Sequence, residues 1–429
     1  MSATAESNAP TPVAAQSGAL GRSRFALVFT LAFASLLWLL GGLANGWWWH
    51  PPGLVNLAGV NIGRDFVAFW SAAGLALSGQ PASAYDHAAL QAAELHAIGA
   101  PVNFTAWFYP PFVQLLAAPL ALLPYLAALL LWLLAPLSGL LVVARRFAPH
   151  AWAAIATLIF PATAQCLITG QNGILTALIV AGGLLQLERR PILAGLILGT
   201  LSYKPHIAAP VFAALLFGRY WQSLGTAVGV AALLAASSIV IFGLEPWIAF
   251  ARESHYATAL LEDGQLPWDF MATVFAAARL AGFAVPLAYA LQIAVALAAL
   301  IALYLVWRRR GSLGPRAAVL AAIIPLTTPF AYNYDLVVVV IALIWLAREG
   351  LQSGFRRGEI AVLALAWAIP VAGWLLASWS HVLVTPIVLV LLLGVLLRRV
   401  FSSAERDVSR LPQRVSAPRL YQRAGSRPF

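Results

Sequence analysis

Two charged residues that lie far apart in the chain, Asp65 and Lys204, are the best candidates for chemistry. Asp65 follows Arg64 and precedes an aromatic-rich stretch, in a chain with only 15 acidic residues among 429. A carboxylate in such a setting could act as a general base toward a hydroxyl group. The structural alternative is that Arg64 and Asp65 form a pair that caps a short interfacial helix.

Lys204 is the single lysine of the chain, within the sequence Tyr203-Lys204-Pro205-His206. A compact ammonium group suits a phosphate as a point charge, and an ionisable group in an apolar region is usually functional. The alternative is a lysine that snorkels from a helix end. His206 could in principle bind a metal, but no HxH or HExxH spacing supports a metal site, and we predict none.

Other polar residues are weaker candidates, each with a structural alternative. Gln171 and Asn172 either cap the following helix or contact a sugar. Asp335, which follows Tyr334, either caps the next helix or hydrogen-bonds a substrate hydroxyl. His255 is expected on a loop surface, with a substrate contact as the alternative.

The composition determines which elements must position these residues. Hydrophobic residues make up 62% of the chain and charged residues 10%, and the mean hydropathy is +0.84. Soluble domains carry about 25% charged residues, so the composition indicates a polytopic membrane protein. Because irregular backbone cannot face lipid, the fold class is all-α, a membrane-spanning helical bundle. The single cysteine, Cys166, excludes an internal disulfide and a cysteine-based metal cluster.

The apolar stretches predict about 10–12 transmembrane segments in a domain at 23–400, between disordered tails at 1–22 and 401–429. Long outer loops are expected at 46–110 and 244–269, the first with interfacial helices at 66–78 and 86–98. Residues 150–168 should return as one segment, whereas 191–217 should form two half-helices that meet at Tyr203–His206, where Pro205 breaks the helix. The remaining spans are expected at 25–45, 174–187, 222–243, 285–307, 317–331, 335–347, 360–378 and 383–397. The apolar run 109–145 is too long for one straight span, so its first part is expected to lie shallow or to kink.

The placement of charge predicts the topology. With both termini in the cytoplasm, the inside receives 22 arginines and six acids, and the outside receives three arginines, Lys204 and nine acids. The net charge of +11 therefore reflects membrane topology, and we predict no nucleic-acid partner. All the candidate polar residues then fall at the outer ends of helices, which suggests one shared extracytoplasmic cavity.

Several short motifs resemble those of glycosyltransferase family 87, and their order and spacing cover about residues 25–345. They are Asp65-Phe66 with Phe69-Trp70, Gly79-Gln80-Pro81, Tyr85-Asp86, Tyr109-Pro110-Pro111, Gly170-Gln171-Asn172-Gly173, Tyr203-Lys204-Pro205, and Thr328-Pro329 followed by Tyr334-Asp335.

This resemblance implies a GT-C fold and an inverting, mannosyltransferase-like hexosyltransferase of a bacterial plasma membrane, although a pentose donor is also open. The family includes polyprenyl-phosphate-mannose-dependent α-1,2-mannosyltransferases of mycobacterial envelope glycolipid synthesis. The family's catalytic aspartate falls on Asp65 and its motif lysine on Lys204, whereas relatives often have Gln where this chain has His206. Donor-sugar and phosphate binding are then expected at Arg64, Tyr203, Lys204, His206, Gln171, Asn172, Tyr334, Asp335 and His255.

The expected partners are a polyprenyl-phosphate sugar, a glycolipid or glycan acceptor and the lipid bilayer, with no obligate protein partner. We expect no cofactor because the donor is already activated, although the sequence leaves a divalent metal open. The alternative is a transporter or lipid flippase, which would also explain the broken helix at Tyr203–His206. An envelope polymerase or ligase would share the donor and the topology.

Overall fold

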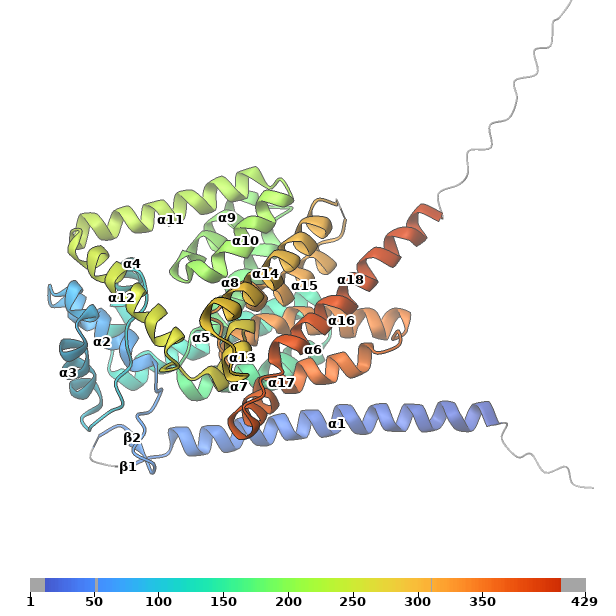
Figure 1. Ribbon diagram of the computed structural model, residues 1–429, viewed down its shortest axis with the longest axis horizontal. Helices are drawn as coiled ribbons and strands as arrows, with labels where there is room; N and C mark the ends of the chain where they lie inside the picture. The colour runs from blue at the N-terminus through green and yellow to red at the C-terminus, as the bar shows by residue number, and fades with distance from the viewer. Residues whose placement is uncertain (1–11, 51–52, 310, 410–429) are drawn as a thin grey trace, which may run out of the picture.

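The computed structural model describes residues 12–50, 53–309 and 311–409, which form a bundle of α-helices (Figure 1). Two short strands, β1 (Trp49–His50) and β2 (Val55–Asn56), pair antiparallel after the first helix. The α-helices and the short 3-10 helices (η) are α1 (Pro12–Trp47), α2 (Phe66–Leu77), η1 (Pro81–Tyr85), α3 (His87–Ile98), α4 (Phe112–Ala121), α5 (Tyr125–Phe147), α6 (Ala151–Ile159), α7 (Pro161–Thr169), α8 (Gly173–Gln186), α9 (Pro191–Gly199), η2 (Thr200–Tyr203), α10 (Pro205–Phe217), α11 (Trp221–Phe242), α12 (Glu245–Glu262), η3 (Trp268–Phe270), α13 (Val274–Leu280), α14 (Val285–Trp307), α15 (Leu313–Ile323), η4 (Ile324–Leu326), η5 (Asn333–Val339), α16 (Val340–Ser353), α17 (Glu359–Ser380) and α18 (Thr385–Ser409).

The described residues contain seven helices that are long and apolar enough to cross a membrane. A bent pair, α6 and α7, would add one more, and six shorter apolar helices accompany them. This confirms the prediction of an all-α polytopic membrane protein. The expected tails are only partly described: 1–11 and 410–429 lie outside the described residues, whereas 12–22 belong to α1 and 401–409 to α18.

Proline explains two of the places where an apolar segment is broken. The segment expected as one span at 150–168 bends by 52° between α6 and α7, because Pro161 starts a new helix there. The predicted break at Tyr203–His206 is present, with Pro205 in the first turn of α10. Short helices at such breaks leave backbone ends that must find partners inside the protein.

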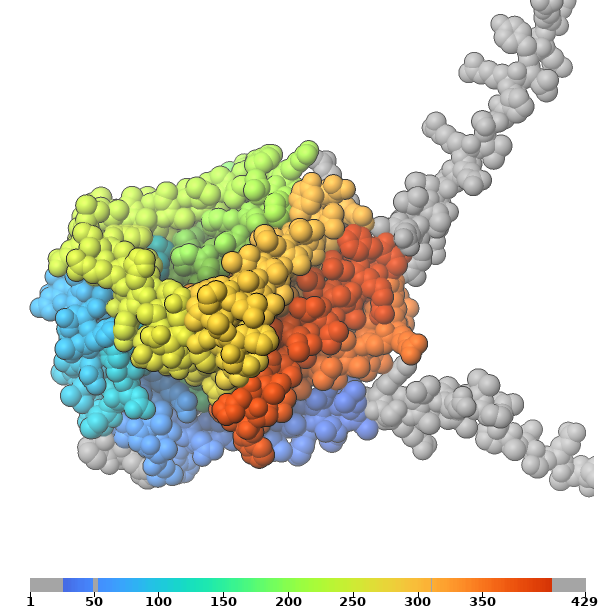
Figure 2. Space-filling model, viewed as in Figure 1, coloured from blue at the N-terminus to red at the C-terminus, as the bar shows by residue number. Residues whose placement is uncertain are grey.

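The first long loop contains the two predicted short helices, α2 and α3, but the second expected loop is mostly helical. Residues 244–269 contain α12, whose first turn holds Glu245 and Pro246, both favourable at a helix N-terminus. In the space-filling view α12 (yellow) lies beside the first-loop elements (blue and cyan), and it packs against η1 (Figure 2). The two loops thus cover the same end of the bundle.

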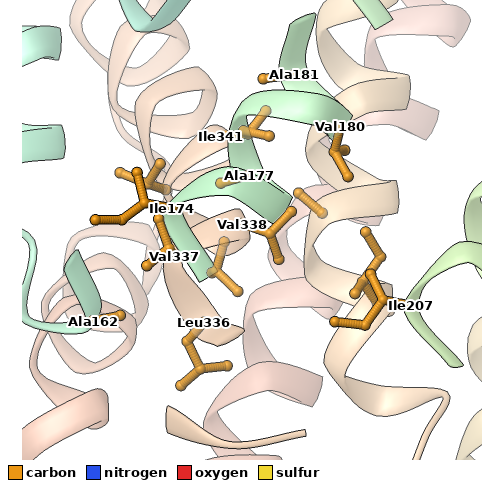
Figure 3. Packing of buried hydrophobic residues seen from close by; sticks show 14 of the residues in the cluster. Ala162, Ile174, Ala177, Val180, Ala181, Ile207, Leu336, Val337, Val338 and Ile341 are labelled. Carbon is orange, nitrogen blue, oxygen red and sulfur yellow. The ribbon is translucent and has the colours of Figure 1, made fainter. Parts of the chain in front are cut away.

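The core of the bundle is built around α8, which packs against α9, α5 and η5. Its small and branched side chains, including Ile174 and Ala177, meet Val337 and Val338 of η5 (Figure 3). Close packing of this kind fixes the start of α8 relative to the start of η5, and both starts carry candidate site residues.

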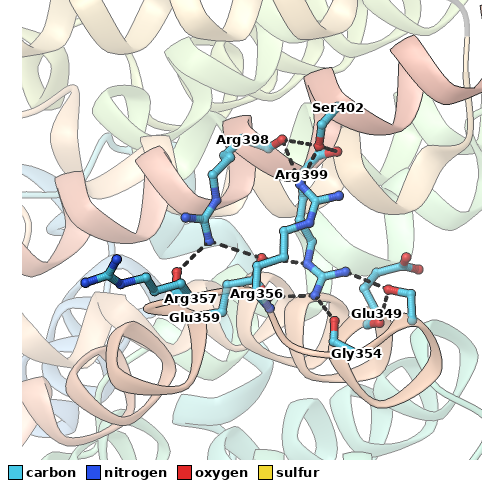
Figure 4. Close-up of polar contacts among 9 residues, drawn as sticks. Glu349, Gly354, Arg356, Arg357, Glu359, Arg398, Arg399 and Ser402 are labelled. Carbon is cyan, nitrogen blue, oxygen red and sulfur yellow. Dashed lines mark hydrogen bonds and ion pairs between the residues drawn. The ribbon is translucent and has the colours of Figure 1, made fainter.

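Arginines connect the helix ends at the end of the bundle opposite to the two loops. Arg316 of α15 pairs with Glu188, which follows α8, and Arg348 of α16 donates to the carbonyl oxygen at the end of α5. The buried carboxylate of Glu359 at the start of α17 forms an ion pair with the guanidinium group of Arg399 of α18, with an N–O distance of 2.6 Å (Figure 4). Since α8 starts beside Gln171 and Asn172 and ends near Glu188, the arginine-rich turns lie one helix length away from the candidate site.

Candidate functional site

A cavity of about 1280 Å³ lies where the first loop, the start of α8, the break before α10 and the start of η5 meet. Both Asp65 and Lys204 line this cavity. The other sequence-predicted residues in its wall are Arg64, Gln171, Tyr203, His206, Tyr334 and Asp335. Residues distant in the sequence therefore share one chamber, as the charge pattern predicted.

A strained turn positions Asp65. Gly63 and Arg64 both have positive φ angles, +74° and +32°, and such a conformation is rare for a residue with a side chain. The backbone N–H of Asp65 donates to the carbonyl oxygen of Thr169 at 3.0 Å, which anchors the turn on the last residue of α7. The carboxylate accepts a hydrogen bond of 2.8 Å from the amide of Gln171. The Asp65 side chain makes no cap bond to α2, so it does not act as the helix cap that was the structural alternative.

The turn Gly170–Gly173 connects the other parts of the site. A Cβ atom on Gly170 would collide with the carbonyl oxygen of Gly63, and one on Gly173 would collide with that of Tyr334. Only glycine allows both backbones to approach so closely. Asn172, between them, makes no side-chain cap for α8 but donates to the hydroxyl of Tyr109 at 2.8 Å.

Lys204 is not a free cation. Its ammonium group donates to Asp335 at 2.6 Å, and both residues are buried, with 5% and 2% of their surfaces exposed. The second carboxylate oxygen of Asp335 accepts from the backbone N–H of Tyr332, so Asp335 also caps η5. The lysine expected to meet a phosphate alone therefore belongs to a neutral ion pair.

Aromatic rings line the wall beside this ion pair. The ammonium group of Lys204 lies 5.5 Å from the centroid of the Tyr334 ring, which stacks on Tyr332 at 5.3 Å. Phe270 of η3 contacts both rings, and Trp374 of α17 meets Phe270 edge to face. Such faces suit the C–H faces of a sugar ring, and a buried ion pair can both donate to hydroxyl groups and accept from them.

The first loop also shapes the cavity from the side of α3. The buried carboxylate of Glu94 accepts from the backbone N–H of Thr105, and the hydroxyl of Tyr85 donates to the carbonyl oxygen of Tyr109. Thr105 and Tyr109 both line the cavity. Burial raises the pKa of Glu94 to about 8.

The electrostatics at Asp65 favour proton acceptance. Burial raises the pKa of Asp65 above its ordinary value of 3.8, and the Gln171 hydrogen bond and the charge of Arg64 offset part of that rise. A raised pKa makes a carboxylate a better proton acceptor near neutral pH. Arg64 is exposed in the cavity wall, and none of the ion pairs among the described residues involves it.

Three predicted residues take less direct positions. Asn172 is buried behind the wall, with 1% of its surface exposed, and His255 is exposed on α12 outside the cavity, although its neighbour Tyr256 lines it. His206 lines the cavity, and its Nε2 atom has no hydrogen-bond partner within the part of the chain that the structure describes. Within that part, no group of three or more His, Cys, Asp or Glu residues is placed to hold a metal ion.

Sequence reasoning missed several cavity residues because they come from elements that were assigned other roles. Tyr109 appears only in the motif Tyr109-Pro110-Pro111, and its aromatic neighbours do not distinguish a membrane-interface anchor from a residue that lines a cavity. Phe270, Trp374 and Gln165 lie outside the motifs quoted above. A buried glutamine such as Gln165 in an apolar helix was the one available signal.

Comparison with known proteins identifies one match. A family model described as "Glycosyltransferase family 87" matches residues 107–329, just over half of the chain. The matched stretch contains Gln171 and Lys204, whereas Asp65 precedes it and Asp335 follows it. No curated protein and no solved structure matches.

Proposed function

The chain belongs to glycosyltransferase family 87 and is a membrane glycosyltransferase, and from this premise we propose that it uses a polyprenyl-phosphate sugar as donor. The observation that carries the proposal is the cavity that contains Asp65, the exposed Arg64 and the Lys204–Asp335 pair together. A membrane-anchored donor suits this cavity because apolar helices surround it. We place the reaction on the extracytoplasmic side, because the arginine-rich turns lie at the opposite helix ends.

Asp65 is the general base in this proposal. Its carboxylate takes the proton of an acceptor hydroxyl group while that oxygen attacks the anomeric carbon. The new C–O bond forms as the bond between the anomeric carbon and the phosphate oxygen breaks, and the electron pair leaves with the polyprenyl phosphate. Attack opposite to the leaving group inverts the anomeric centre. The hydrogen bond from Gln171 would keep the carboxylate aimed into the cavity.

The ion pair changes which cation is best suited to the phosphate. A phosphate placed beside Lys204 would also meet the carboxylate of Asp335, and two like charges about 4 Å apart repel by about 4 kcal/mol at an effective dielectric constant of 20. Among the described residues no carboxylate lies within ion-pair distance of Arg64, although its charge acts on neighbouring Asp65. A guanidinium group can bind phosphate with two hydrogen bonds. We therefore assign the phosphate to Arg64 and the sugar hydroxyl groups to Lys204 and Asp335, with Tyr334 under the sugar ring.

Substitution of the proposed base tests the function. Membranes that carry the protein are supplied with radiolabelled polyprenyl-phosphate mannose and with the corresponding glucose and pentose donors, and consumption of each donor is followed. Asp65→Asn keeps the size and the hydrogen-bonding shape of the side chain and should lower transfer about 10²- to 10⁴-fold, the usual contribution of a general base.

The control for this experiment is Asp86→Asn. Asp86 caps α3 in the same loop and does not line the cavity, so its variant should keep full transfer. Full activity in Asp65→Asn would remove Asp65 from the mechanism. Movement of a glycolipid across the membrane without donor consumption would favour the transporter alternative.

A further inference from the structure

One side of the cavity lies along α1, and we call this side the arm. The arm's lining from α1 consists of Leu37, Trp38, Gly41, Gly42, Asn45 and Gly46. Trp38 lies nine residues before the end of α1, which corresponds to about 13 Å along the helix. Since Ala26–Trp47 can span a membrane, the arm reaches the middle of an apolar span.

Two polar atoms in this arm have no partner within the described residues: Nε1 of Trp38 and Oε1 of Gln165. Both side chains line the cavity, and only 3% of the Gln165 surface is exposed. The amide of Gln165 donates to the carbonyl oxygen of Pro370 at 2.9 Å, and this bond fixes which end of the amide remains unpaired. Unpaired polar groups at such a depth are unfavourable, and most buried ones are satisfied.

The packing of α1 on α7 brings these two side chains to the same level. Gly42 lies so close to Ile168 that a Cβ atom on the glycine would collide with the isoleucine side chain. Trp38 is one turn before Gly42 on α1, and Gln165 is about one turn before Ile168 on α7. Both helices end beside the first loop, so one turn back along each reaches the same depth.

The arm is continuous with the side of the cavity that holds Asp65. The carbonyl oxygen of Thr169 accepts a hydrogen bond from the backbone N–H of Asp65, and the hydroxyl group of Thr169 donates to the carbonyl oxygen of Gln165. Four residues of helix separate Gln165 from Thr169, about 6 Å along α7. A molecule with one hydroxyl group at Asp65 could therefore place a second hydroxyl group one sugar ring deeper, beside Gln165.

We propose that Trp38 and Gln165 bind a second hydroxyl group of the acceptor, and that the acceptor is a glycolipid whose sugar or polyol headgroup enters this arm. A hydroxyl group both donates and accepts, as the indole N–H and the amide oxygen require together, whereas a polyprenyl chain does neither and an ionised phosphate only accepts. Both atoms are buried in this conformation, although the Trp38 side chain as a whole is partly exposed, so binding of a hydroxyl group requires the side chains around them to move. The inference rests on the proposed function in one respect, that the molecule beside Asp65 is the acceptor.

Lipid binding tests this proposal without any turnover. The purified full-length protein, in a polyoxyethylene detergent, is titrated with monohexosyl diacylglycerol and with the same diacylglycerol that carries a methyl ether in place of the hexose. Native mass spectrometry gives a Kd for each lipid. We expect tighter binding of the hexosyl lipid, because only this lipid offers hydroxyl groups to the arm.

Three variants each change one feature of the arm. Trp38→Phe removes the indole N–H, and Gln165→Met removes the amide oxygen together with the amide N–H that donates to Pro370. Each variant should weaken binding of the hexosyl lipid about 2- to 10-fold, the effect of one neutral hydrogen bond to the lipid. Gly41 has open space where its Cβ atom would be, so Gly41→Leu fills the arm and should remove the preference for the hexosyl lipid. In each of the three variants, the change in the Kd of the methyl ether lipid should be no larger than the change in the Kd of the hexosyl lipid.

Two matched controls separate the arm from general effects on folding. Trp367→Phe removes an indole N–H that donates to Ser35 at 2.9 Å in the same layer of α1 and α17, outside the cavity. Gly229→Leu places the same side chain on an open helical position of α11. Both controls should keep the wild-type ratio of the two Kd values.

Equal Kd values for the two lipids in the wild-type protein would overturn the proposal, as would an unchanged ratio in Trp38→Phe and Gln165→Met. If Trp38→Phe does not fold, Gly41→Leu provides the same test. Lipid binding is measured without transfer, so the two proposals fail independently. Sugar transfer by Asp65→Asn would refute only the role of Asp65 as general base. Equal Kd values for the two lipids would refute only the acceptor site in the arm.

Discussion

The ion pair between Lys204 and Asp335 allows a quantitative test of how the site is stabilised. The charged atoms are 2.6 Å apart, and the side chains are 6% and 3% exposed. Asp335→Asn removes the negative charge and keeps an oxygen that can accept the backbone N–H of Tyr332. Lys204→Met removes the positive charge and keeps the length of the side chain. The two single variants and the double variant form a thermodynamic cycle.

The distance and the burial fix the expected magnitude. At 2.6 Å and an effective dielectric constant of 20, the attraction is about 6 kcal/mol, and desolvation of both groups offsets much of it. Removal of one partner from such a pair typically destabilises a protein by about 3–5 kcal/mol, because the other charge remains buried. We expect this loss in Asp335→Asn and a smaller one in Lys204→Met, since the remaining carboxylate of Asp335 still accepts the backbone N–H of Tyr332.

The assay is unfolding of the purified protein by SDS in mixed micelles, followed for the wild type and the three variants. The double variant should be more stable than the sum of the two single losses predicts, by at least about 2 kcal/mol, since it leaves no unpaired charge. Additivity within about 0.5 kcal/mol would show that the two groups do not interact, and the reasoning about a neutral pair would fail.

The same variants separate sugar from phosphate binding. Polyprenyl monophosphate carries the phosphate and the chain of the donor but no sugar, so its inhibition constant reports phosphate binding. Lys204→Met should raise the KM of the donor and leave this inhibition constant unchanged, whereas Arg64→Gln should raise the inhibition constant. A large rise of the inhibition constant in Lys204→Met would instead assign phosphate binding to Lys204.

Two further predictions concern the base and the turn that holds it. Because burial raises the pKa of Asp65 and the base must be deprotonated to act, kcat/KM should fall on the acid side at a pH above the ordinary carboxyl value of 3.8. Arg64→Gln removes a charge that lowers this pKa, so the acid limb should move to higher pH, and a shift to lower pH in the pH–rate profile would contradict the assignment. Gly170→Ala places a Cβ atom against Gly63 at a φ of +71° and should destabilise the protein by about 1–3 kcal/mol with loss of transfer. Gly182→Ala, at an open position within α8, should instead be neutral or slightly stabilising in the same unfolding assay, and equal effects would refute the steric argument.

The sequence predicted the parts of the fold that follow from composition and proline. Apolar length predicted a polytopic helical bundle, and Pro205 together with the charge pattern predicted the break at Tyr203–His206. The sequence predicts residues 244–269 as a polar outer loop and does not reveal α12, because Arg252, Glu253 and His255 make this segment look polar while its cavity face carries Tyr256 and other less polar residues. A helix that covers a cavity needs no continuous apolar stripe, so hydrophobic periodicity gives little signal there.

For the site, the sequence identified the residues better than it identified their partners. Asp65 and Lys204 were singled out by rarity, and the structure brings both to one cavity. The pairing of Lys204 with Asp335 joins positions 131 residues apart, and nothing in a single sequence encodes that contact. The rarity of a charged residue indicates that it has a specific partner, but only the fold shows whether that partner is another side chain or a substrate.

The turn Gly170–Gly173 couples the two halves of the proposed mechanism. Gln171 holds the base Asp65, Gly170 packs against the backbone beside that base, and Gly173 packs against the backbone of Tyr334, which adjoins Asp335. A shift of α8 must therefore move the base and the ion pair together. If donor binding at Lys204 and Asp335 shifts this turn, it also changes the position of Asp65, so substitutions in the turn should alter donor KM and kcat together. Lys204→Met, which leaves the turn intact, should act mainly on donor KM.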